Sequence, residues 1–478
     1  MSGDWRERAD ALPASGDWSE RAEALAASGD WSDRRLHFVG IGGAGMSALA
    51  LVARALGAQV TGSDRAESAY LERVRAAGIE PRLGHEAANV PVGDDVELVV
   101  STAIADANPE RAAARERGLG ELHRGALLAQ VSRLRRTIAV AGTHGKTTTA
   151  SMAVHALLAL GHDPSYLVGG ELRRPGEPGR GTNAALGSGD WLVVEADESD
   201  RSFLELEPEI ALVTNIELDH HTTYASRVEL ERAFGNFLRA SLRVVVADSD
   251  DALAFLDREG IAEAAFFGAS DIVLDPGGAS FGWADQRVVL AVPGAHNVAN
   301  AAAALTACAL AGASPQELAG TLADFRGAGR RFEALGETEA GALVVDDYAH
   351  HPTEVRAAIA AARTLGRRRV VAVFQPHLYS RTQALGREFG AALALAEAAC
   401  VLDVYPSRER AEDFPDVSGL LIAEMAADAA AGRPVAWARD FAAAESLLRA
   451  TLRAGDLCLV MGAGNIDELG RRLVTRSV

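Results

Sequence analysis

The 478-residue chain has few residues of several types, and each shortage narrows what the protein can be. Lys146 is the only lysine, although lysine and arginine together number 47. The 3 cysteines lie far apart, which excludes a disulfide-stapled scaffold and fits a reducing compartment such as the cytoplasm. No run of about 18 apolar residues occurs and the first residues are charged, so neither a membrane span nor a secretory signal is expected.

Acidic residues outnumber basic ones, 66 to 47, which gives a formal net charge of −19. A negative net charge disfavours binding to nucleic acid and to anionic membranes, so we expect neither as a partner. With 48% hydrophobic and 24% charged residues, the composition is that of an ordinary globular protein. The length predicts two to four domains, at roughly 100–200 residues each.

The N-terminus repeats itself, because the tetrapeptide Ser-Gly-Asp-Trp begins at Ser2, Ser15 and Ser28. The intervening stretches have helical propensity, but three such short units cannot form a solenoid. We interpret residues 1–33 as an appended tail, which is either a duplicated extension or a partner-binding helix.

Beyond the tail, short apolar runs alternate with amphipathic stretches, which predicts an α/β fold of parallel sheets with crossover helices. The predicted strands fall into three blocks: 36–39, 58–61 and 98–101; then 137–141, 191–194, 210–213 and 244–247; then 343–345, 370–374, 400–404 and 457–461. We therefore predict domains over residues 34–134, 135–329 and 330–478.

A glycine-rich loop, GIGGAG, spans residues 40–45 between a predicted strand and a predicted helix. Glycines let the backbone approach a phosphate, and the helix N-terminus supplies N–H donors. Asp64 follows at the spacing of a ribose-binding acid. The loop favours a nucleotide of some kind, and the alternative is a tight turn that only packs a helix on a sheet.

A second loop, AGTHGKTT, spans residues 141–148 and precedes a helix predicted over 149–160. In such a loop, backbone N–H groups cradle phosphates, Lys146 neutralises the β- and γ-phosphate oxygens, and the Thr147 hydroxyl ligates Mg²⁺. The strict phosphate-loop pattern is not met, because Val140 stands at its first position. The only lysine nevertheless stands where the motif requires one, so we predict a nucleoside triphosphate site.

Carboxylates and histidines follow two further strands of the central block. Glu195 opens the run EADESD directly after an apolar strand, and carboxylates beside a phosphate loop indicate a hard cation. The run TNIELDHH over 214–221, which contains His220, also follows a strand. Taken alone, each run could be a solvated loop.

Four shorter motifs lie in the last part of the chain. They are PGAHN (293–297), GRRF (329–332), DDYAHHPTE (346–354) and FQPHLYSRT (374–382). Alone, each is compatible with buried polar residues that fix loops. The last two follow predicted strands, and ligands of open α/β sheets bind at the carboxyl ends of strands.

Together these motifs resemble the Mur ligases, the ATP-dependent amino-acid ligases of bacterial peptidoglycan precursor synthesis, over about residues 35–470. The resemblance rests on GIGGAGMS (40–47), GTHGKTTT (142–149), EADESD (195–200), VTNIELDH (213–220), PGAHNVAN (293–300), GRRF (329–332), DDYAHHPTE (346–354) and FQPHLYSRT (374–382). The first loop with Ser63-Asp64 is most similar to members that join L-alanine to UDP-N-acetylmuramate.

The resemblance implies a Rossmann-like N-terminal domain for UDP-N-acetylmuramate, a central P-loop ATPase-like parallel-sheet domain for ATP and Mg²⁺, and a Rossmann-like C-terminal domain for L-alanine. The implied substrate-binding residues are Gly42, Gly43, Ala44, Gly45, Met46, Ser47, Asp64, Tyr348, His350 and Arg381. The implied ATP-binding residues are Gly142, Thr143, His144, Gly145, Lys146, Thr147, Thr148, Asn297 and Arg331. The implied metal ligands are Thr147, Glu195 and His220, and the implied catalytic residues are Lys146, His220, Arg331 and His350.

The chain departs from the family pattern at two points. Leu378 stands where the family has an arginine, so Arg381 is left to bind the amino-acid carboxylate. Several relatives use a carbamylated lysine near a second metal, and this chain has no lysine besides Lys146. The oligomeric state stays open between a monomer and a homodimer.

Three other functions compete with L-alanine ligation. A nicotinamide dehydrogenase would explain the first loop but not the central block. A non-catalytic ATP-dependent switch would explain the second loop alone. Within the family, a ligase that attaches recycled murein peptide to the same UDP-sugar is the nearest alternative.

Overall fold

The computed structural model describes residues 30–173, 181–219 and 223–477, so most of the predicted tail lies outside the described residues. The chain forms two compact units. One extends to Gly268 and also contains Asn300–Leu322, and the other comprises Ala269–Ala299 and Ala323–Val478. No helix of the described ranges is long and apolar enough to cross a membrane.

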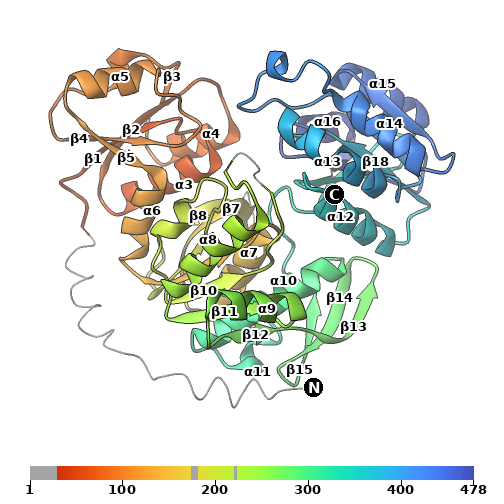
Figure 1. The fold of residues 1–478 in the computed structure, drawn as a ribbon, viewed down its shortest axis with the longest axis horizontal. Helices are drawn as coiled ribbons and strands as arrows, with labels where there is room; N and C mark the ends of the chain where they lie inside the picture. Colours follow the sequence, from red (N-terminus) through yellow and green to blue (C-terminus); the bar gives the residue numbers. More distant parts are fainter. Residues whose placement is uncertain (1–29, 174–180, 220–222, 478) are drawn as a thin grey trace. The chain divides into compact units, whose positions relative to one another are not determined.

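The first sheet is five-stranded and parallel, in the order β3-β2-β1-β4-β5 that is typical of doubly wound folds. Its strands are β1 (Arg35–Val39), β2 (Gln59–Asp64), β3 (Arg82–Leu83), β4 (Val96–Val100) and β5 (Gly120–His123). Its helices are α3 (Ala44–Ala55), α4 (Ala69–Ala76), α5 (Pro109–Glu116) and α6 (Arg124–Ser132), as Figure 1 shows. Leu36 and Phe38 face one core and Val39 the other, so β1 is buried on both faces.

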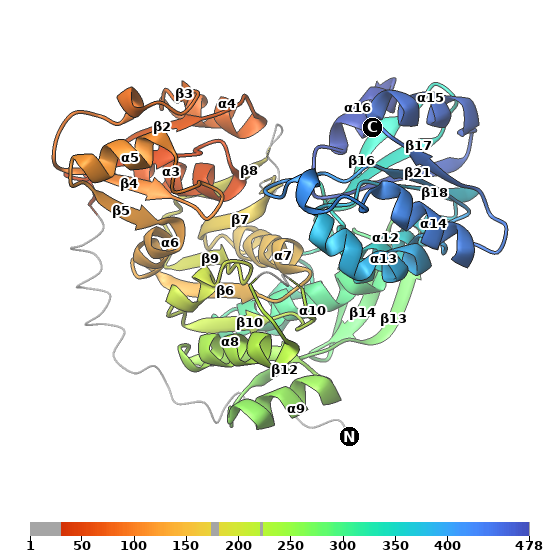
Figure 2. The same cartoon turned by 45° about the horizontal axis from the view of Figure 1, so that its top comes forward.

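The second sheet has seven strands in the order β12-β11-β10-β6-β9-β7-β8, parallel except for β8. Its strands are β6 (Arg136–Ala141), β7 (Ser165–Leu172), β8 (Thr182–Ala185), β9 (Trp191–Glu195), β10 (Ile210–Val213), β11 (Arg243–Ala247) and β12 (Ala265–Phe267). The helices are α7 (Lys146–Ala159), α8 (Arg227–Arg239), α9 (Asp250–Glu259), α10 (Ala295–Leu310) and α11 (Pro315–Leu318). Helix α7 packs on β6, β9 and β7 and carries the phosphate loop at its N-terminus (Figure 2).

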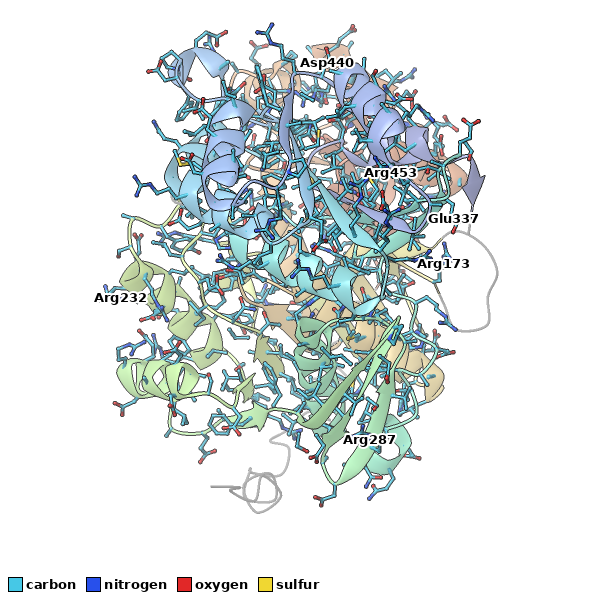
Figure 3. All side chains as sticks on the ribbon, turned by 90° about the vertical axis from the view of Figure 1, so that its right-hand side faces the viewer. Arg173, Arg232, Arg287, Glu337, Asp440 and Arg453 are labelled. Carbon is cyan, nitrogen blue, oxygen red and sulfur yellow. The ribbon has the colours of Figure 1, made fainter. Side chains whose placement is uncertain are left out.

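The second unit holds two further sheets. Strands β13 (Ser270–Asp275), β14 (Gly278–Trp283) and β15 (Gln286–Leu290) form an antiparallel sheet. Arg287 of β15 donates to the Asp271 carbonyl and to Ser280 Oγ, which ties the strands together (Figure 3). The sequence analysis did not predict this sheet. The six residues of β13 are all exposed, although those of β14 alternate between half-buried and buried.

The last sheet has the order β20-β19-β18-β21-β17-β16-β22 and is parallel except for β16, which pairs antiparallel with both β17 and β22. Its strands are β16 (Glu333–Glu337), β17 (Leu343–Asp347), β18 (Arg369–Phe374), β19 (Ala398–Leu402), β20 (Val435–Ala438), β21 (Asp456–Met461) and β22 (Arg476–Ser477). Its helices are α12 (Pro352–Thr364), α13 (Tyr379–Leu393), α14 (Gly419–Ala429), α15 (Phe441–Thr451) and α16 (Asp467–Leu473). Cys308, Cys400 and Cys458 are buried free thiols, as a reducing compartment allows.

A buried polar network occupies the first domain around Glu110, which lies in the first turn of α5 and is 0% exposed. Its Oε2 accepts hydrogen bonds from His37 Nε2 at 2.9 Å and Ser63 Oγ at 2.8 Å. Its Oε1 accepts from Asn89 Nδ2 at 3.0 Å and lies 3.2 Å from His85 Nδ1. Burial alone would raise the pKa of Glu110, but the bonds from His37, Asn89 and Ser63 outweigh it and lower the pKa to about 2.

This lowered pKa predicts how acid destabilises the first domain. The Glu110 charge stabilises the fold above its unfolded pKa of 4.5, and that contribution is lost as the pH falls toward 2. The difference corresponds to about 3 kcal/mol. Between pH 5 and 2.5, the melting temperature of the native protein should therefore fall more steeply than that of Glu110→Gln. An equal fall in melting temperature with pH for the two proteins would contradict the lowered pKa of Glu110.

Candidate active site

The loop that precedes α7 is built around the Lys146 ammonium. Lys146 Nζ donates to the Gly142 carbonyl at 2.6 Å and lies 3.2 Å from the Thr143 carbonyl. It also lies 2.9 Å from a carboxylate oxygen of Glu198, a side chain that is only 1% exposed. Burial alone would lower the pKa of Lys146, but Glu198, Glu195 and Asp197 outweigh it and raise the pKa. The lysine is therefore held charged in the mouth of the loop.

Two positions of this loop require glycine. Gly142 has φ +131°, and a Cβ there would lie 2.1 Å from Thr214 Oγ1. Gly145 caps α7 with φ +80°, and a Cβ there would lie 2.4 Å from Asn300 Oδ1. Because Gly145 supplies this left-handed cap, α7 begins at Lys146 and not at Thr149 as the sequence predicted.

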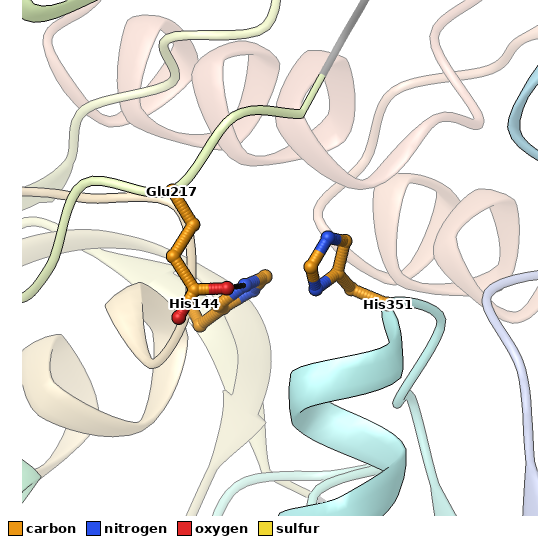
Figure 4. Close-up of side chains that lie close together, drawn as sticks. All are labelled: His144, Glu217 and His351. Carbon is orange, nitrogen blue, oxygen red and sulfur yellow. Dashed lines mark hydrogen bonds and ion pairs between the residues drawn. The ribbon is translucent and has the colours of Figure 1, made fainter. Parts of the chain in front are cut away.

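Hydrogen bonds join this loop to the segment after β10. Asn215 accepts the Thr143 N–H at its carbonyl, at 3.1 Å, and the His144 N–H at its side-chain oxygen, at 2.9 Å. His144 Nε2 lies 3.3 Å from a Glu217 carboxylate oxygen (Figure 4). The N–H groups of Thr143 and His144 are thus already engaged. The N–H groups that remain available to a phosphate are those of the first turn of α7, because they have no carbonyl partner within the helix.

Thr147 and Glu195 form a compact set of oxygen ligands beside the loop. Thr147 Oγ1 lies 2.9 Å from Glu195 Oε2, which also accepts the Gly169 N–H at 2.7 Å. Two oxygens at this spacing fit adjacent positions around one octahedral Mg²⁺, whose ligands lie about 2.1 Å from the ion. The ligand chemistry and spacing therefore suit the predicted metal. His220, the other predicted ligand, lies outside the described residues.

An arginine of the first domain reaches the acidic run of the central domain. Arg124, the first residue of α6, lies 2.7 Å from Asp197 and 2.6 Å from Asp200. Burial alone would raise the pKa of Asp197, but Arg124 and Lys146 hold it well below its usual range. This cluster therefore connects the phosphate loop with the first domain.

The glycine-rich loop of the first domain is anchored by the end of β2. Gly42 N–H donates to Asp64 Oδ2 at 2.8 Å, and a Cβ on Gly42 would lie 2.8 Å from that oxygen. Gly43 and Gly45 are exposed, whereas Met46 and Ser47 are buried at 4% and 1% exposure. Of the predicted substrate-binding set, Gly43 and Gly45 present backbone to solvent, Gly42 is buried, and the Met46 and Ser47 side chains are buried as well.

The predicted amino-acid site is a cluster of rings and guanidinium groups in the last domain. The ring of Tyr348 lies 5.5 Å from that of His350, which lies 6.2 Å from the ring of His377. His377 stacks on Tyr405 at 5.8 Å, and its Nδ1 lies 3.3 Å from an Arg381 nitrogen. The structure therefore brings Tyr348, His350 and Arg381 together, with His377 between the last two.

Two aspartates at the end of β17 hold the segment that precedes β16. Arg330 Nε lies 3.1 Å from Asp346 Oδ2, and the Phe332 N–H donates to Asp347 Oδ2 at 2.8 Å. Burial raises the pKa of Asp346 to about 7 and that of Asp347 to about 6, only partly offset by the arginines. Arg331 lies over the Tyr348 ring at 4.8 Å, so the structure places it at the amino-acid cluster.

Asn297, predicted to meet adenine, lies in the first turn of α10. Its side chain is 5% exposed, and its Nδ2 donates to the Pro293 carbonyl at 2.7 Å. This bond fixes the entry into α10, and the role toward adenine stays a prediction.

Comparison with known sequences accounts for nearly the whole described chain. The Mur ligase family, catalytic domain, matches residues 35–136, and the Mur ligase middle domain matches 140–308. The Mur ligase, glutamate ligase domain, matches residues 330–464. The chain belongs to the Mur ligase family. The family membership predicted from the eight motifs is thus confirmed.

Individual relatives of this Mur ligase match along most of their length. A UDP-N-acetylmuramate--L-alanine ligase of Streptomyces coelicolor is 43% identical, covering 92% of this chain and 97% of its own. One of Kineococcus radiotolerans is 47% identical, covering 91% and 94%. The solved UDP-N-acetylmuramate-alanine ligase of Thermotoga maritima superposes with a TM-score of 0.78 at 28% identity, covering 92% and 98%. The predicted three-domain α/β fold is confirmed.

The structure of this Mur ligase adds residues to the site that the sequence did not single out. Glu198 pairs with Lys146, Asn215 holds the phosphate loop, and Asn300 lies against Gly145. In the last domain, His377 and Tyr405 complete the ring cluster. All except Tyr405 lie inside motifs that the sequence marked, whereas their individual contacts became visible only with the fold.

Proposed function

We propose that this Mur ligase joins L-alanine to the carboxylate of UDP-N-acetylmuramate at the expense of ATP, in cytoplasmic peptidoglycan precursor synthesis. The observation that carries the proposal is the loop before α7, where the only lysine is held charged beside the Thr147–Glu195 pair. Relatives with that activity in their names are 42–47% identical over 91–92% of the chain, which supports the choice of substrates.

The first step activates the carboxylate. The substrate oxygen attacks the γ-phosphorus of ATP, the bond to ADP breaks, and an acyl phosphate forms. Such a transfer needs positioning and charge neutralisation more than covalent chemistry. Lys146 supplies charge at the β- and γ-phosphates, and the N–H groups of the first turn of α7 supply hydrogen bonds. We assign Arg331 to the same phosphates and Asn297 to the adenine side.

Mg²⁺ is the metal we expect at Thr147 and Glu195. When bound there, it neutralises phosphate charge and orients the triphosphate. The Glu195 carboxylate and the Thr147 hydroxyl hold it, and the Gly169 N–H orients the carboxylate. We assign His220 to a second ion on the sequence motif alone.

The second step forms the amide. The free amine of L-alanine attacks the acyl carbon, phosphate leaves with its bonding electrons, and the nitrogen loses a proton. We assign Arg381 to the alanine carboxylate, and His350, whose Nδ1 lies 3.2 Å from Glu354, is a candidate base. Enclosure of the reactants would keep water from the acyl phosphate.

Removing the carboxylate charge at the proposed metal site should raise the Mg²⁺ requirement. Glu195→Gln loses one charged ligand, so the Mg²⁺ concentration for half-maximal activity should rise about 10-fold or more. The UDP-sugar should bind as before. Glu207→Gln, at a half-exposed glutamate of the same unit, should keep the native requirement. An unchanged requirement in Glu195→Gln would remove this residue from the ligand set.

Thermal melting with separate ligands tests the nucleotide assignment. ATP with Mg²⁺ should raise the melting temperature, because a ligand that binds only the folded state stabilises it. NAD should leave the melting temperature unchanged. The product is then sought by mass spectrometry after incubation with UDP-N-acetylmuramate, ATP and L-alanine. A rise in melting temperature with NAD and none with ATP would favour a dehydrogenase over the proposed ligase.

A further inference from the structure

We infer that Glu110 is a positioning residue for the UDP-sugar site, acting through Ser63 and His85. This inference rests on the proposed function, because it assigns UDP-N-acetylmuramate to the glycine-rich loop of the first domain. Glu110 lies in none of the eight family motifs, and it touches neither that loop nor Asp64 in the contacts described. We infer that Glu110 acts on the site through two of its four side-chain partners, Ser63 and His85.

The first connection runs through Ser63 to the loop. Ser63 is 0% exposed, and its Oγ donates to Glu110 Oε2 at 2.8 Å. Its carbonyl accepts the N–H groups of Gly40 at 2.8 Å and Ile41 at 2.9 Å, the two residues at the start of the loop. The next residue, Asp64, accepts the Gly42 N–H. A displacement of Ser63 would therefore move three consecutive loop residues and the predicted ribose-binding acid.

The second connection runs to the segment after β3, at the same edge of the sheet. Leu83 of β3 pairs with Asp64, and His85 follows two residues later. His85 Nδ1 lies 3.0 Å from Ser63 Oγ and 3.2 Å from Glu110 Oε1, while its side chain is 18% exposed. Asn89 Nδ2 bonds both Glu110 and the Gly84 carbonyl. Glu110 thus sets the orientation of a histidine that reaches solvent beside Asp64.

The arrangement requires a carboxylate and not merely a polar side chain. Each Glu110 oxygen faces two donor groups: His37 and Ser63 at Oε2, and Asn89 and His85 at Oε1. An ionised carboxylate has about four acceptor positions, so it accepts all four. A glutamine in its place would turn one oxygen into an NH₂ donor opposite two donors, which separates the segments that Glu110 joins.

The test compares Glu110→Gln with a matched buried glutamate. Glu209 is 2% exposed, and its two oxygens each lie 2.7 Å from Arg136 at the amino ends of β6 and β10, away from the site. Both variants should melt at a lower temperature. Only Glu110→Gln should raise the KM for UDP-N-acetylmuramate, by about 10-fold, the effect of one charged hydrogen bond. Its KM for ATP and its kcat at saturating UDP-sugar should stay within about 2-fold of native values.

The outcomes separate this inference from the proposed function. A native enzyme that releases no phosphate with UDP-N-acetylmuramate and L-alanine overturns the function. If the native enzyme is functional, the inference is overturned when Glu110→Gln keeps the native KM for the UDP-sugar. It is also overturned when Glu209→Gln raises that KM as much as Glu110→Gln does. If Glu110→Gln does not fold, Ser63→Ala decides, because it cuts the link to the loop and leaves the other three Glu110 contacts. Ser63→Ala should raise the KM for UDP-N-acetylmuramate and no other KM. An unchanged KM for the UDP-sugar in Ser63→Ala overturns the inference.

Discussion

Lys146→Arg should abolish ligation, with a loss on the order of 10²–10³-fold or more in kcat, although the positive charge is kept. The ammonium fits against two carbonyl oxygens, of Gly142 and Thr143, and the buried Glu198 carboxylate. A guanidinium is planar and larger, and its donors form a fixed fork, so it cannot satisfy the same three partners. The variant should also lose the melting shift with ATP and keep the shift with UDP-N-acetylmuramate.

The reverse exchange at an exposed site is the control for Lys146→Arg. Arg239 on α8 is 43% exposed on its side chain and pairs with Glu259, so Arg239→Lys should be fully active. Steady-state kinetics with saturating UDP-sugar and L-alanine give the comparison. Activity of Lys146→Arg within about 3-fold of native would contradict the phosphate-loop assignment.

Arg381→Ala should raise the KM for L-alanine strongly and leave the KM for ATP nearly unchanged. Arg381 is 4% exposed and lies 3.3 Å from His377, within the ring cluster that contains Tyr348 and His350. With Leu378 in place of a second arginine, the proposal leaves the carboxylate contact to Arg381. A charged hydrogen bond contributes about 1.5–3 kcal/mol, so the KM should rise roughly 10- to 150-fold.

A neighbouring arginine of the same helix makes the Arg381 experiment specific. Arg387 on α13 is exposed, so Arg387→Ala should keep the native KM for L-alanine. Leu378→Arg restores the family pattern and should lower this KM or leave it unchanged. The assignment fails if Arg381→Ala impairs ATP instead, or if alanine amide, which lacks the carboxylate, is used as well as L-alanine.

The strands that were predicted are largely buried and read as apolar runs, whereas others such as β7 were not predicted. The strand predicted over 210–213 is confirmed residue for residue as β10. The antiparallel strands β13 to β15 were missed: β13 is exposed along its whole length, whereas β14 has an alternating burial pattern that the sequence analysis did not pick out. The start of α7 was predicted three residues late, because the left-handed Gly145 cap is a backbone feature that composition does not reveal.

The site was predictable as a set of motifs but not as a set of contacts. Lys146 was singled out because it is unique, and Glu195 because it ends a strand. The Glu198 partner of Lys146 and the Asn215 lock on the loop depend on pairings between β6, β9 and β10 that are distant in sequence. Glu110 lies in no motif, and the role inferred for it rests on the side chains that it joins.

The central claim is ligation of L-alanine to UDP-N-acetylmuramate, and phosphate release tests it most directly. The purified chain is incubated with ATP, Mg²⁺ and UDP-N-acetylmuramate, against a panel of amino acids and the recycled murein tripeptide. We predict phosphate release that requires the UDP-sugar and is fastest with L-alanine. Release that is fastest with the peptide, or that proceeds without the UDP-sugar, would contradict the account.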